Sequence, residues 1–494
     1  MTGVEQVEHA DGRVELADGL TLSDARLYNE DLAPTKLARR TWTTYAFAAL
    51  WISMAHCIPT YILASGLIKL GMSWSQAIVT ILLGNSVVLA PILLNSHAGT
   101  KYGIPFPVFA RASYGVFGAN VPAVMRAIVA CGWFGIQCWI GGHALDRFIA
   151  SLWSGWPTAL GSGQIDGYLP TQWLCYAVFW GLNILIVYRG MELLRRVENW
   201  AAPYVLVMTL LLLVWIVRRA SGTGGGIGAI VSQESKFPDF GSFMAVFVPS
   251  VTAMVGFWAT LSLNMPDFTR FGRSQREQAV GQVVALPTTM TLFAAMGVFI
   301  TSASAQVFGE AIWDPIDLGA KLESRGLVAI AELTAVIATL AMNIAANVVS
   351  PANDFSNLAP SRISFRTGGL MTGLLATAMM PWKLLENSDR YINGWLLGYS
   401  GGLGSIAGVL ICDYWLIKRT RLALPDLYRR DGVYAYGSPI GTNWAAIVAT
   451  AVGCLVAWIG IFVPALHWLY DAAWFTGTLS SGLVYGIWMW GRRA

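Results

Sequence analysis

The sequence predicts an all-α polytopic membrane protein with twelve transmembrane helices, and three observations support this prediction. Of 494 residues, 55% are hydrophobic and only 12% are charged, whereas soluble domains carry roughly 25% charged residues. Apolar runs of about 18 or more residues, about twelve in all, recur along the whole chain, and each is long enough to cross a bilayer core. Two of these runs contain Gly or Pro interruptions at corresponding places.

The chain begins with a polar segment that we interpret as a cytoplasmic tail over residues 1–42. Four acidic residues, Glu5, Glu8, Asp11 and Glu15, precede any apolar run, so the segment is not a signal peptide. The formal net charge of +4 is small, and its pattern does not indicate nucleic-acid binding. The six cysteines lie in or at the ends of apolar runs without a C-x-x-C spacing. We expect buried thiols rather than disulfides or metal ligands, and no cofactor.

The first predicted span covers residues 45–67 and reads M-A-H-C-I-P-T-Y in its middle. Pro59 lacks a backbone donor and clashes with the preceding turn, so the helix should kink or unwind between His56 and Thr60. Unwound backbone is tolerated at membrane depth only where it lines a cavity or the protein interior. A merely kinked helix is the alternative.

The sixth predicted span, residues 243–263, carries the matching interruption. Gly256 can release the helix and Pro266 closes the segment. Paired interruptions at equivalent positions of two halves indicate the binding site of a transporter. We therefore predict two inverted five-helix repeats, followed by a loop and two peripheral helices, over residues 43–219, 220–416 and 417–494.

The other spans are predicted over residues 76–94, 121–152, 173–187, 201–217, 280–303, 327–349, 370–382, 392–411, 444–463 and 474–490. Residues 97–115 read as a structured connection, and the glycine-rich residues 222–228 read as a linker because the setting of a phosphate loop is missing. Lys and Arg gather in the loops that are inside when the N-terminus is inside. This asymmetry predicts a multi-pass protein of the plasma or inner membrane with both termini in the cytoplasm.

The polar residues of the third and eighth spans form two pairs. Trp133 and Gln137 are four residues apart, as are Asn343 and Asn347, so each pair lies on one face of its helix. If the halves are inverted repeats, the two spans are equivalent. Trp258 in the sixth span supplies a second indole.

These residue types suit a flat, neutral molecule that carries amide groups. Indole faces stack on planar rings, and carboxamides match the alternating N–H and C=O groups of a cyclic amide or ureide. The predicted site holds no Lys, Arg, Asp or Glu, which favours an uncharged ligand. The alternative is structural, since Trp also anchors membrane interfaces and Asn and Gln also link helices.

At these residues the chain resembles the nucleobase cation symporters, which include hydantoin, allantoin, cytosine and uracil permeases. The most specific motifs are G-T-K-Y-G-I-P-F-P-V-F-A-R-A-S-Y-G, W-F-G-I-Q, W-A-T-L-S-L-N-M-P-D-F-T-R, N-I-A-A-N-V-V-S-P-A and C-D-Y-W. The segment H-C-I-P-T-Y places it closest to the bacterial allantoin permease branch, with the uracil branch left open. The resemblance implies a LeuT-like core of two inverted repeats that works by alternating access.

The resemblance also implies roles for individual residues. Trp133 and Trp258 would sandwich the substrate, Gln137 and Asn347 would bind its amide groups, and Asn343 would lie nearby. A backbone group would contribute at Phe257. A glutamine of the hydantoin permease matches Cys57 here, which puts hydantoin itself in doubt.

The coupling ion is where the sequence departs most from the family. The family's sodium site would use backbone carbonyls at Ser53, His56 and Ala338 and two hydroxyls at positions that are Ala341 and Met342 here. Neither side chain offers an oxygen, and Na⁺ is a hard ion that needs oxygen ligands. We expect coupling to H⁺ or ion-independent transport rather than coupling to Na⁺.

The candidate proton carriers are His56, Asp267 and Glu332, because a histidine titrates near neutral pH and the two acids lie near predicted helix ends. A purely structural role for His56 remains the alternative.

The sequence therefore predicts a transporter, not an enzyme, that imports a neutral nucleobase or cyclic ureide of the allantoin, uracil, cytosine, purine or hydantoin type. Its expected partners are a small heterocycle and the lipid bilayer, with no nucleic acid. The oligomeric state is not predicted. The alternatives are a membrane channel for small polar solutes and a sodium-coupled hydantoin permease.

Overall fold

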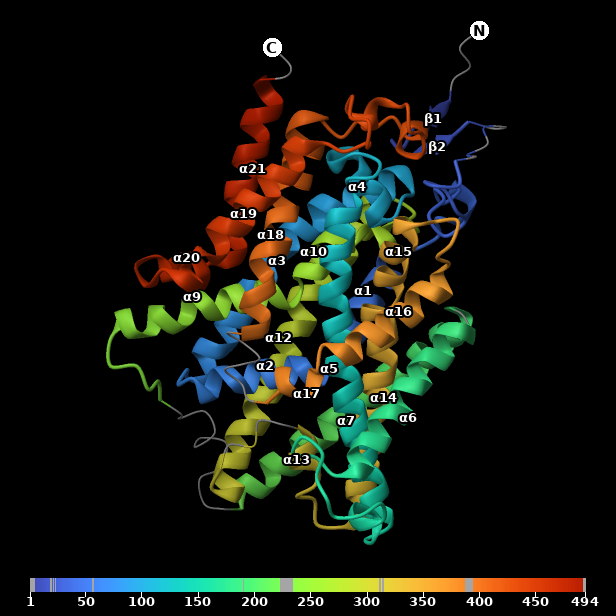
Figure 1. The fold of residues 1–494 in the computed structure, drawn as a ribbon. Helices are drawn as coiled ribbons and strands as arrows, with labels where there is room; N and C mark the ends of the chain where they lie inside the picture. Colours follow the sequence, from blue (N-terminus) through green and yellow to red (C-terminus); the bar gives the residue numbers. More distant parts are fainter. Residues whose placement is uncertain are drawn as a thin grey trace.

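The chain folds into a long bundle of helices with a small β-hairpin at one end (Figure 1). The computed structural model describes residues 5–491 apart from 18–19, 21, 23, 56, 190, 223–233, 311, 313–314 and 387–393. The hairpin pairs β1 (Gln6–Glu8) with the antiparallel β2 (Val14–Leu16) inside the predicted polar tail. Within the described residues every predicted span coincides with one or more helices.

Eight helices are long and apolar enough to cross a membrane, or nine when one bent pair is counted as a single span, within the part of the chain that the structure describes. They include α3 (Trp74–Tyr102), α5 (Asn120–Leu152), α6 (Pro170–Arg189), α9 (Phe240–Phe257), α12 (Gln275–Phe308), α14 (Arg325–Asn347), α18 (Leu397–Ile411) and α19 (Trp444–Phe462). The three other predicted spans are the helices α7 (Met191–Ser221), α16 (Phe365–Ala378) and α21 (Ala473–Gly491). The count of twelve and the division into repeats at residues 219 and 416 stay predictions.

The first span is broken, as Pro59 predicts. Helices α1 (Thr44–Ala55) and α2 (Ile58–Lys69) meet at an angle of 59°. Cys57 between them has an extended backbone, and Pro59 lies in the first turn of α2, where the missing N–H costs no helical hydrogen bond. The extended backbone of Cys57 confirms the unwound alternative over a merely kinked helix. His56 lies outside the described residues.

The sixth span is broken twice. Helix α9 ends at Phe257, α10 (Ala259–Asn264) follows after Trp258, and α11 (Pro266–Thr269) begins with the proline that the sequence marks as a stop. Trp258 has φ −105° and ψ 9°, so the indole projects from the interruption itself. The eighth span is also interrupted, at Val348, and continues as α15 (Val349–Leu358); the sequence does not predict this continuation.

The connection at residues 97–115 is structured, as predicted, but its start belongs to α3, which runs eight residues beyond the predicted end of the second span at residue 94. A serine capping box at Ser73 fixes the beginning of α3, and Gly103, with φ +67°, ends it. The helix α4 (Phe106–Tyr114) then occupies the rest of the connection.

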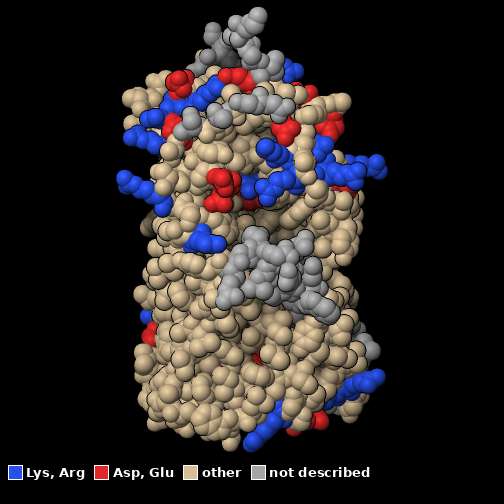
Figure 2. All heavy atoms as spheres, turned by 90° about the vertical axis from the view of Figure 1, so that its right-hand side faces the viewer, with Lys and Arg blue, Asp and Glu red and all other residues tan. Residues whose placement is uncertain are grey.

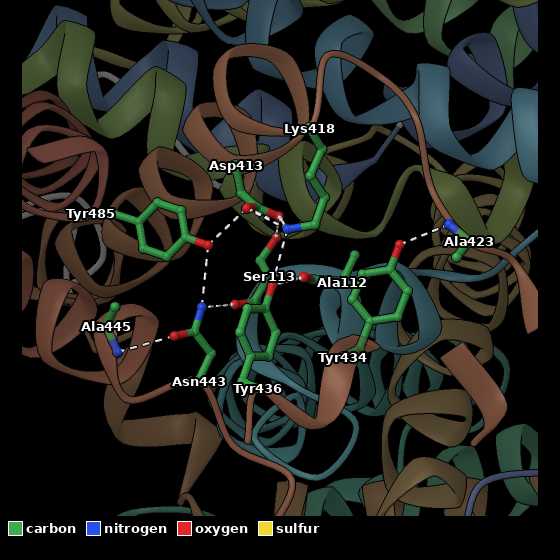
Figure 3. Close-up of polar contacts among 10 residues, drawn as sticks. All are labelled: Ala112, Ser113, Asp413, Lys418, Ala423, Tyr434, Tyr436, Asn443, Ala445 and Tyr485. Carbon is green, nitrogen blue, oxygen red and sulfur yellow. Dashed lines mark hydrogen bonds and ion pairs between the residues drawn. The ribbon is translucent and has the colours of Figure 1, made fainter. Parts of the chain in front are cut away.

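A buried polar network ties α4 to the end of α18 and to α19 and α21 (Figure 3). The carboxylate of Asp413, in the C-D-Y-W motif, accepts hydrogen bonds from Ser113, from Tyr485 and, through both oxygens at 2.6 Å, from Lys418. Burial lowers the pKa of Lys418, but its contacts with Asp413 and Tyr436 outweigh this effect, so the pKa lies above its usual value. Asn443 also donates to the carbonyl of Ser113 at 2.7 Å. The network fixes this end of the bundle against the connection helix.

Short elements complete the fold: η1 (Leu37–Arg39), η2 (Trp156–Thr158), α13 (Pro315–Gly319), α17 (Pro381–Leu384), η4 (Cys412–Ile417), η5 (Pro425–Tyr428), η6 (Val433–Ala435), η7 (Pro464–Leu466) and α20 (His467–Asp471). The hairpin and the far end of α21 lie at the same end of the molecule, which we call the terminal end (Figure 1). On the face in Figure 2, charged side chains gather at the terminal end and at the opposite rim. A broad band almost free of charge separates them, as in a protein that crosses a bilayer.

Candidate functional site

The two predicted indoles lie in the interior on either side of one aromatic ring. Trp133 on α5 is 4% exposed, and Trp258 at the α9–α10 interruption is 2% exposed. The ring of Phe257 packs edge-on against both, with centroid distances of 5.2 Å to Trp133 and 4.9 Å to Trp258. The helix break therefore brings an indole of the sixth span next to an indole of the third. The sequence predicts a backbone role for Phe257, and its side chain also forms a wall of the site.

A tyrosine that the sequence analysis did not single out connects these elements. Tyr399 on α18 accepts a hydrogen bond from Nε1 of Trp133 at 3.1 Å and donates one to the carbonyl of Gly256 at 2.7 Å. That carbonyl belongs to the last turn of α9, where helices leave acceptors unpaired. Tyr399 thus holds the indole of Trp133 and the helix interruption in fixed relative positions.

Two more tryptophans enclose the pair. Trp51 on α1 packs edge-on against Trp258 at 5.1 Å, and Trp395 lies 6.3 Å from Trp133 and 4.9 Å from Tyr399. The broken first span contributes to the site through Trp51 and Cys57. None of these rings was predicted, because their spacing in the sequence does not tell them apart from anchoring tryptophans.

Gln137 lies one turn beyond Trp133 and is fully buried. Its Nε2 donates to the sulfur of Met342 at 2.9 Å, and it also interacts with the Cys57 thiol. Its Oε1 forms no hydrogen bond with the described residues, and neither does Nε1 of Trp258. A buried polar atom without a partner costs about 1–3 kcal/mol, so these two atoms suit a ligand that supplies a donor and an acceptor.

The predicted asparagines form a chain of amides that ends at the site. Asn347 donates to Oδ1 of Asn343 at 3.0 Å, and Asn343 donates to Oδ1 of Asn183 at 3.1 Å. Asn343 and Asn183 are fully buried, whereas Asn347 is 7% exposed. Asn343 therefore links α14 to α6, in agreement with the alternative that Asn side chains connect helices, and it orients Asn347. Asn183 on α6 was missed, although an amide inside an apolar run was the available signal.

Four of the five residues at the predicted sodium position lie in the part of the chain that the structure describes. Ala338, Ala341 and Met342 are buried on α14, and Ser53 on α1 is half-buried, while His56 lies outside the described residues. The Met342 side chain is turned toward Gln137, so it serves the amide rather than a cation. The side chains at 341 and 342 supply no oxygen ligand.

A cavity lies beside the predicted site. It has a volume of about 420 Å³ and lies between α2, α7, α12 and α14, where it is lined mostly by apolar side chains. Cys57 and Ala338 border it, whereas Trp133, Gln137, Trp258, Asn343 and Asn347 do not. Of the two acidic candidates, Glu332 lines this cavity and Asp267 is buried on α11.

A family model described as a permease for cytosine/purines, uracil, thiamine and allantoin matches residues 34–477. Among curated proteins, an allantoin permease of Bacillus subtilis is 42% identical over 465 residues, covering 94% of this chain and 93% of the relative. A purine-uracil permease of Arabidopsis thaliana is 39% identical over 502 residues, covering 99% of this chain and 80% of the relative.

Among solved structures, the transporter Mhp1 in a closed conformation with bromovinylhydantoin bound has the same fold, with a TM-score of 0.76 and 25% identity. The match covers 94% of this chain and 96% of that one. Mhp1 is described as a member of the nucleobase-cation-symport-1 family.

Proposed function

Because the chain belongs to the family of permeases for cytosine/purines, uracil, thiamine and allantoin, we propose that it imports a neutral nucleobase or cyclic ureide by alternating access. It is a transporter and not an enzyme, as its relatives are permeases. We place both termini in the cytoplasm, because the hairpin and the end of α21 share one end of the bundle and the loops on the side of the N-terminus carry more Lys and Arg than the loops on the other side.

The observation that supports this proposal best is the convergence of two indoles and two carboxamides from separate helices. Trp133 and Gln137 come from α5, Trp258 from the α9–α10 break, and Asn347 from α14. All four are buried and uncharged. A flat ring with N–H and C=O groups at its edge could stack on the indoles and pair with Oε1 of Gln137.

The substrate we favour is allantoin or a related ureide, since the relative with 42% identity is an allantoin permease. A purine or uracil substrate is the nearest alternative, on the strength of the plant relative. Cys57, which lines the neighbouring cavity and interacts with Gln137, offers a thiol where the hydantoin permease would offer a second amide. A thiol is a weak donor and a weak acceptor, so a ligand that depends on that amide should bind less well.

We propose coupling to H⁺ rather than to Na⁺. The positions equivalent to the two sodium-binding hydroxyls are Ala341 and Met342, and the sulfur of Met342 accepts from Gln137 instead. Na⁺ at this place would depend on backbone carbonyls alone, which is a weak ligand set for a hard cation.

The test is a titration of purified protein with allantoin, uracil, cytosine, adenine and hydantoin, monitored by tryptophan fluorescence with and without Na⁺. We expect saturable quenching by one ureide or nucleobase that does not depend on Na⁺. Uptake by Trp133→Ala and Asn347→Ala should be lost although both variants reach the membrane. Undiminished uptake in both variants would refute the site, and non-saturable flux would identify a channel.

A further inference from the structure

A buried ionic cluster lies about two helical turns from the substrate-site residues, toward the terminal end. Arg126 on α5 and Asp354 on α15 are both fully buried and form an ion pair at 3.3 Å. Asp267 on α11 is 2% exposed and lies close enough to interact electrostatically with both. These three groups take no part in the substrate site.

Each member of the cluster stands on a span that also carries a substrate-site residue. Arg126 precedes Trp133 by seven residues, Asp354 follows Asn347 by seven, and Asp267 follows Trp258 by nine. Seven residues of helix are about 10 Å long. Helix α5 runs unbroken from Arg126 to Trp133, whereas helix breaks separate Asp354 and Asp267 from the substrate-site residues of their spans. A rearrangement at these breaks would therefore change the distance between Arg126 and Asp354.

The charged groups of Arg126 and Asp354 form few hydrogen bonds. Arg126 donates to Oδ2 of Asp354 through Nη1, but its Nε and Nη2 form no hydrogen bond with the described residues, and neither does Oδ1 of Asp354. Breaking or weakening a buried ion pair leaves charge uncompensated at a cost of several kcal/mol. The long, single contact shows that the pair is not held by further bonds.

Asp267 is better compensated than Asp354. Its Oδ1 accepts from the backbone amide of Phe106 at 2.9 Å, at the first turn of α4, where the helix end favours a negative charge. Ser350 also interacts with it. Of the two aspartates, Asp354 is thus the one whose charge depends on Arg126 alone.

The other charged side chains near the cluster form their hydrogen bonds with residues outside it. Arg111 on α4 donates to Asn357 and to the carbonyl of Leu427. Arg270, after α11, donates to the carbonyl of Asp31 and also interacts with Asp267. The titratable group of α5 beside the pair is the thiol of Cys131. Arg126 is therefore the guanidinium that compensates Asp354, whereas Asp267 interacts with both Arg126 and Arg270.

We propose that Asp354 is the site that binds and releases the coupled proton, an inference that rests on the proposed transport function. H⁺ from the external solution adds to Oδ1 of Asp354, and the carboxylate becomes a neutral acid. Arg126 then loses Asp354 as its anionic partner and keeps Asp267 as the carboxylate with which it interacts. Loss of the same proton to the cytoplasm restores the Arg126–Asp354 pair. One proton moves for each substrate.

The experiment uses the full chain in proteoliposomes. Counterflow and accumulation are measured with allantoin or uracil, whichever substrate the fluorescence titration identifies. Counterflow, the exchange of internal for external substrate, needs no net proton movement. Accumulation driven by a gradient of one pH unit can reach about tenfold for one proton, because each unit supplies about 1.4 kcal/mol. The matched control is Asp317→Asn, which removes an exposed acid of α13 that pairs with Arg147.

For wild type and Asp317→Asn we expect both counterflow and roughly tenfold accumulation. For Asp354→Asn we expect counterflow with accumulation reduced to equilibration. Accumulation by Asp354→Asn equal to wild type would overturn the proposal, and so would wild-type counterflow without any response to the pH gradient. In both cases the transport function would stand, whereas wild-type protein without binding or counterflow would refute that function.

A second variant covers the case in which Asp354→Asn does not fold. Asp354→Glu keeps the carboxylate but moves it relative to Arg126, so the pH at which accumulation is half-maximal should shift by at least about half a unit. An unchanged pH profile with full counterflow would show that the Arg126–Asp354 pair is only a structural link between α5 and α15.

Discussion

At the scale of single residues, the site is defined by which polar atoms already have partners and which do not. Asn343 uses both ends of its amide to link Asn347 to Asn183, so it is chiefly an orienting residue. Gln137 keeps a buried carbonyl oxygen without a partner. Two residues of the same chemical type thus have different roles, and the hydrogen-bond geometry distinguishes them.

The first prediction concerns Gln137. Gln137→Ala should weaken substrate binding about 5- to 150-fold, because one hydrogen-bonded edge of the ligand, worth about 1–3 kcal/mol, is left unpaired. The control is Met342→Leu, which removes the sulfur that accepts from Nε2 but leaves the amide in place. Titration of the fluorescence change measures both. Equal affinity of Gln137→Ala and wild type would show that Gln137 does not touch the ligand.

The second prediction concerns Asn183. Asn183→Ala should lower the melting temperature, since Nδ2 of Asn343 loses its amide acceptor in a buried position. Its effect on substrate affinity should be smaller than that of Gln137→Ala. Asn85→Ala is a matched control, because among the described residues that buried asparagine donates only within α3, to the carbonyl of Ile81. A melting curve for Asn183→Ala no different from that of Asn85→Ala would contradict the proposed amide chain.

At the scale of elements, the interrupted helices are what the sequence predicts best and what places the site. Pro59 and Gly256 each mark a break because of local backbone chemistry, which can be read residue by residue. The contributions of Tyr399, Trp51 and Asn183 could not be read in this way. Their roles depend on which helices become neighbours, and no spacing within one helix carries that information.

The third prediction tests the second break. A Cβ at Gly256 would lie 2.8 Å from the carbonyl of Leu396 on the neighbouring chain segment, so Gly256→Ala should push α9 away from α18 and lower the melting temperature and uptake together. Such overpacking typically costs about 1–3 kcal/mol. Gly326→Ala, where nothing lies within 4 Å, should leave both unchanged. Identical behaviour of the two variants would disprove the close approach at the break.

At the scale of the whole molecule, an apolar band between two charged ends follows from composition, and the sequence predicted it correctly. The location of the cavity beside the site could not be predicted. It lies between α2, α7, α12 and α14 and touches the site at Cys57 and Ala338, because cavities arise from imperfect packing of several helices rather than from any one pattern. The continuation of the eighth span through α15, with Asp354 on it, was not predicted, because α15 carries several polar residues and the apolar run ends before it.

The fourth prediction concerns orientation. Epitope tags at either terminus should be inaccessible to antibody in intact spheroplasts of an expression host and accessible after permeabilisation, because the loops on the side of the N-terminus carry more Lys and Arg than those on the other side. A tag inserted after Gly161, in an exposed loop between α5 and α6, should be accessible before permeabilisation. The reverse pattern would contradict the proposed direction of import and the proposed direction of proton movement.

The central claim is that indoles and carboxamides from the third, sixth and eighth spans enclose one neutral heterocycle. The measurement that tests it most directly is an experimental structure of the protein with the ureide or nucleobase that it binds. The account predicts the ring stacked against Trp133 and Trp258, with its amide edge at Gln137 and Asn347. A ligand seated instead in the 420 Å³ cavity between α2, α7, α12 and α14, without contact to either indole, would contradict it.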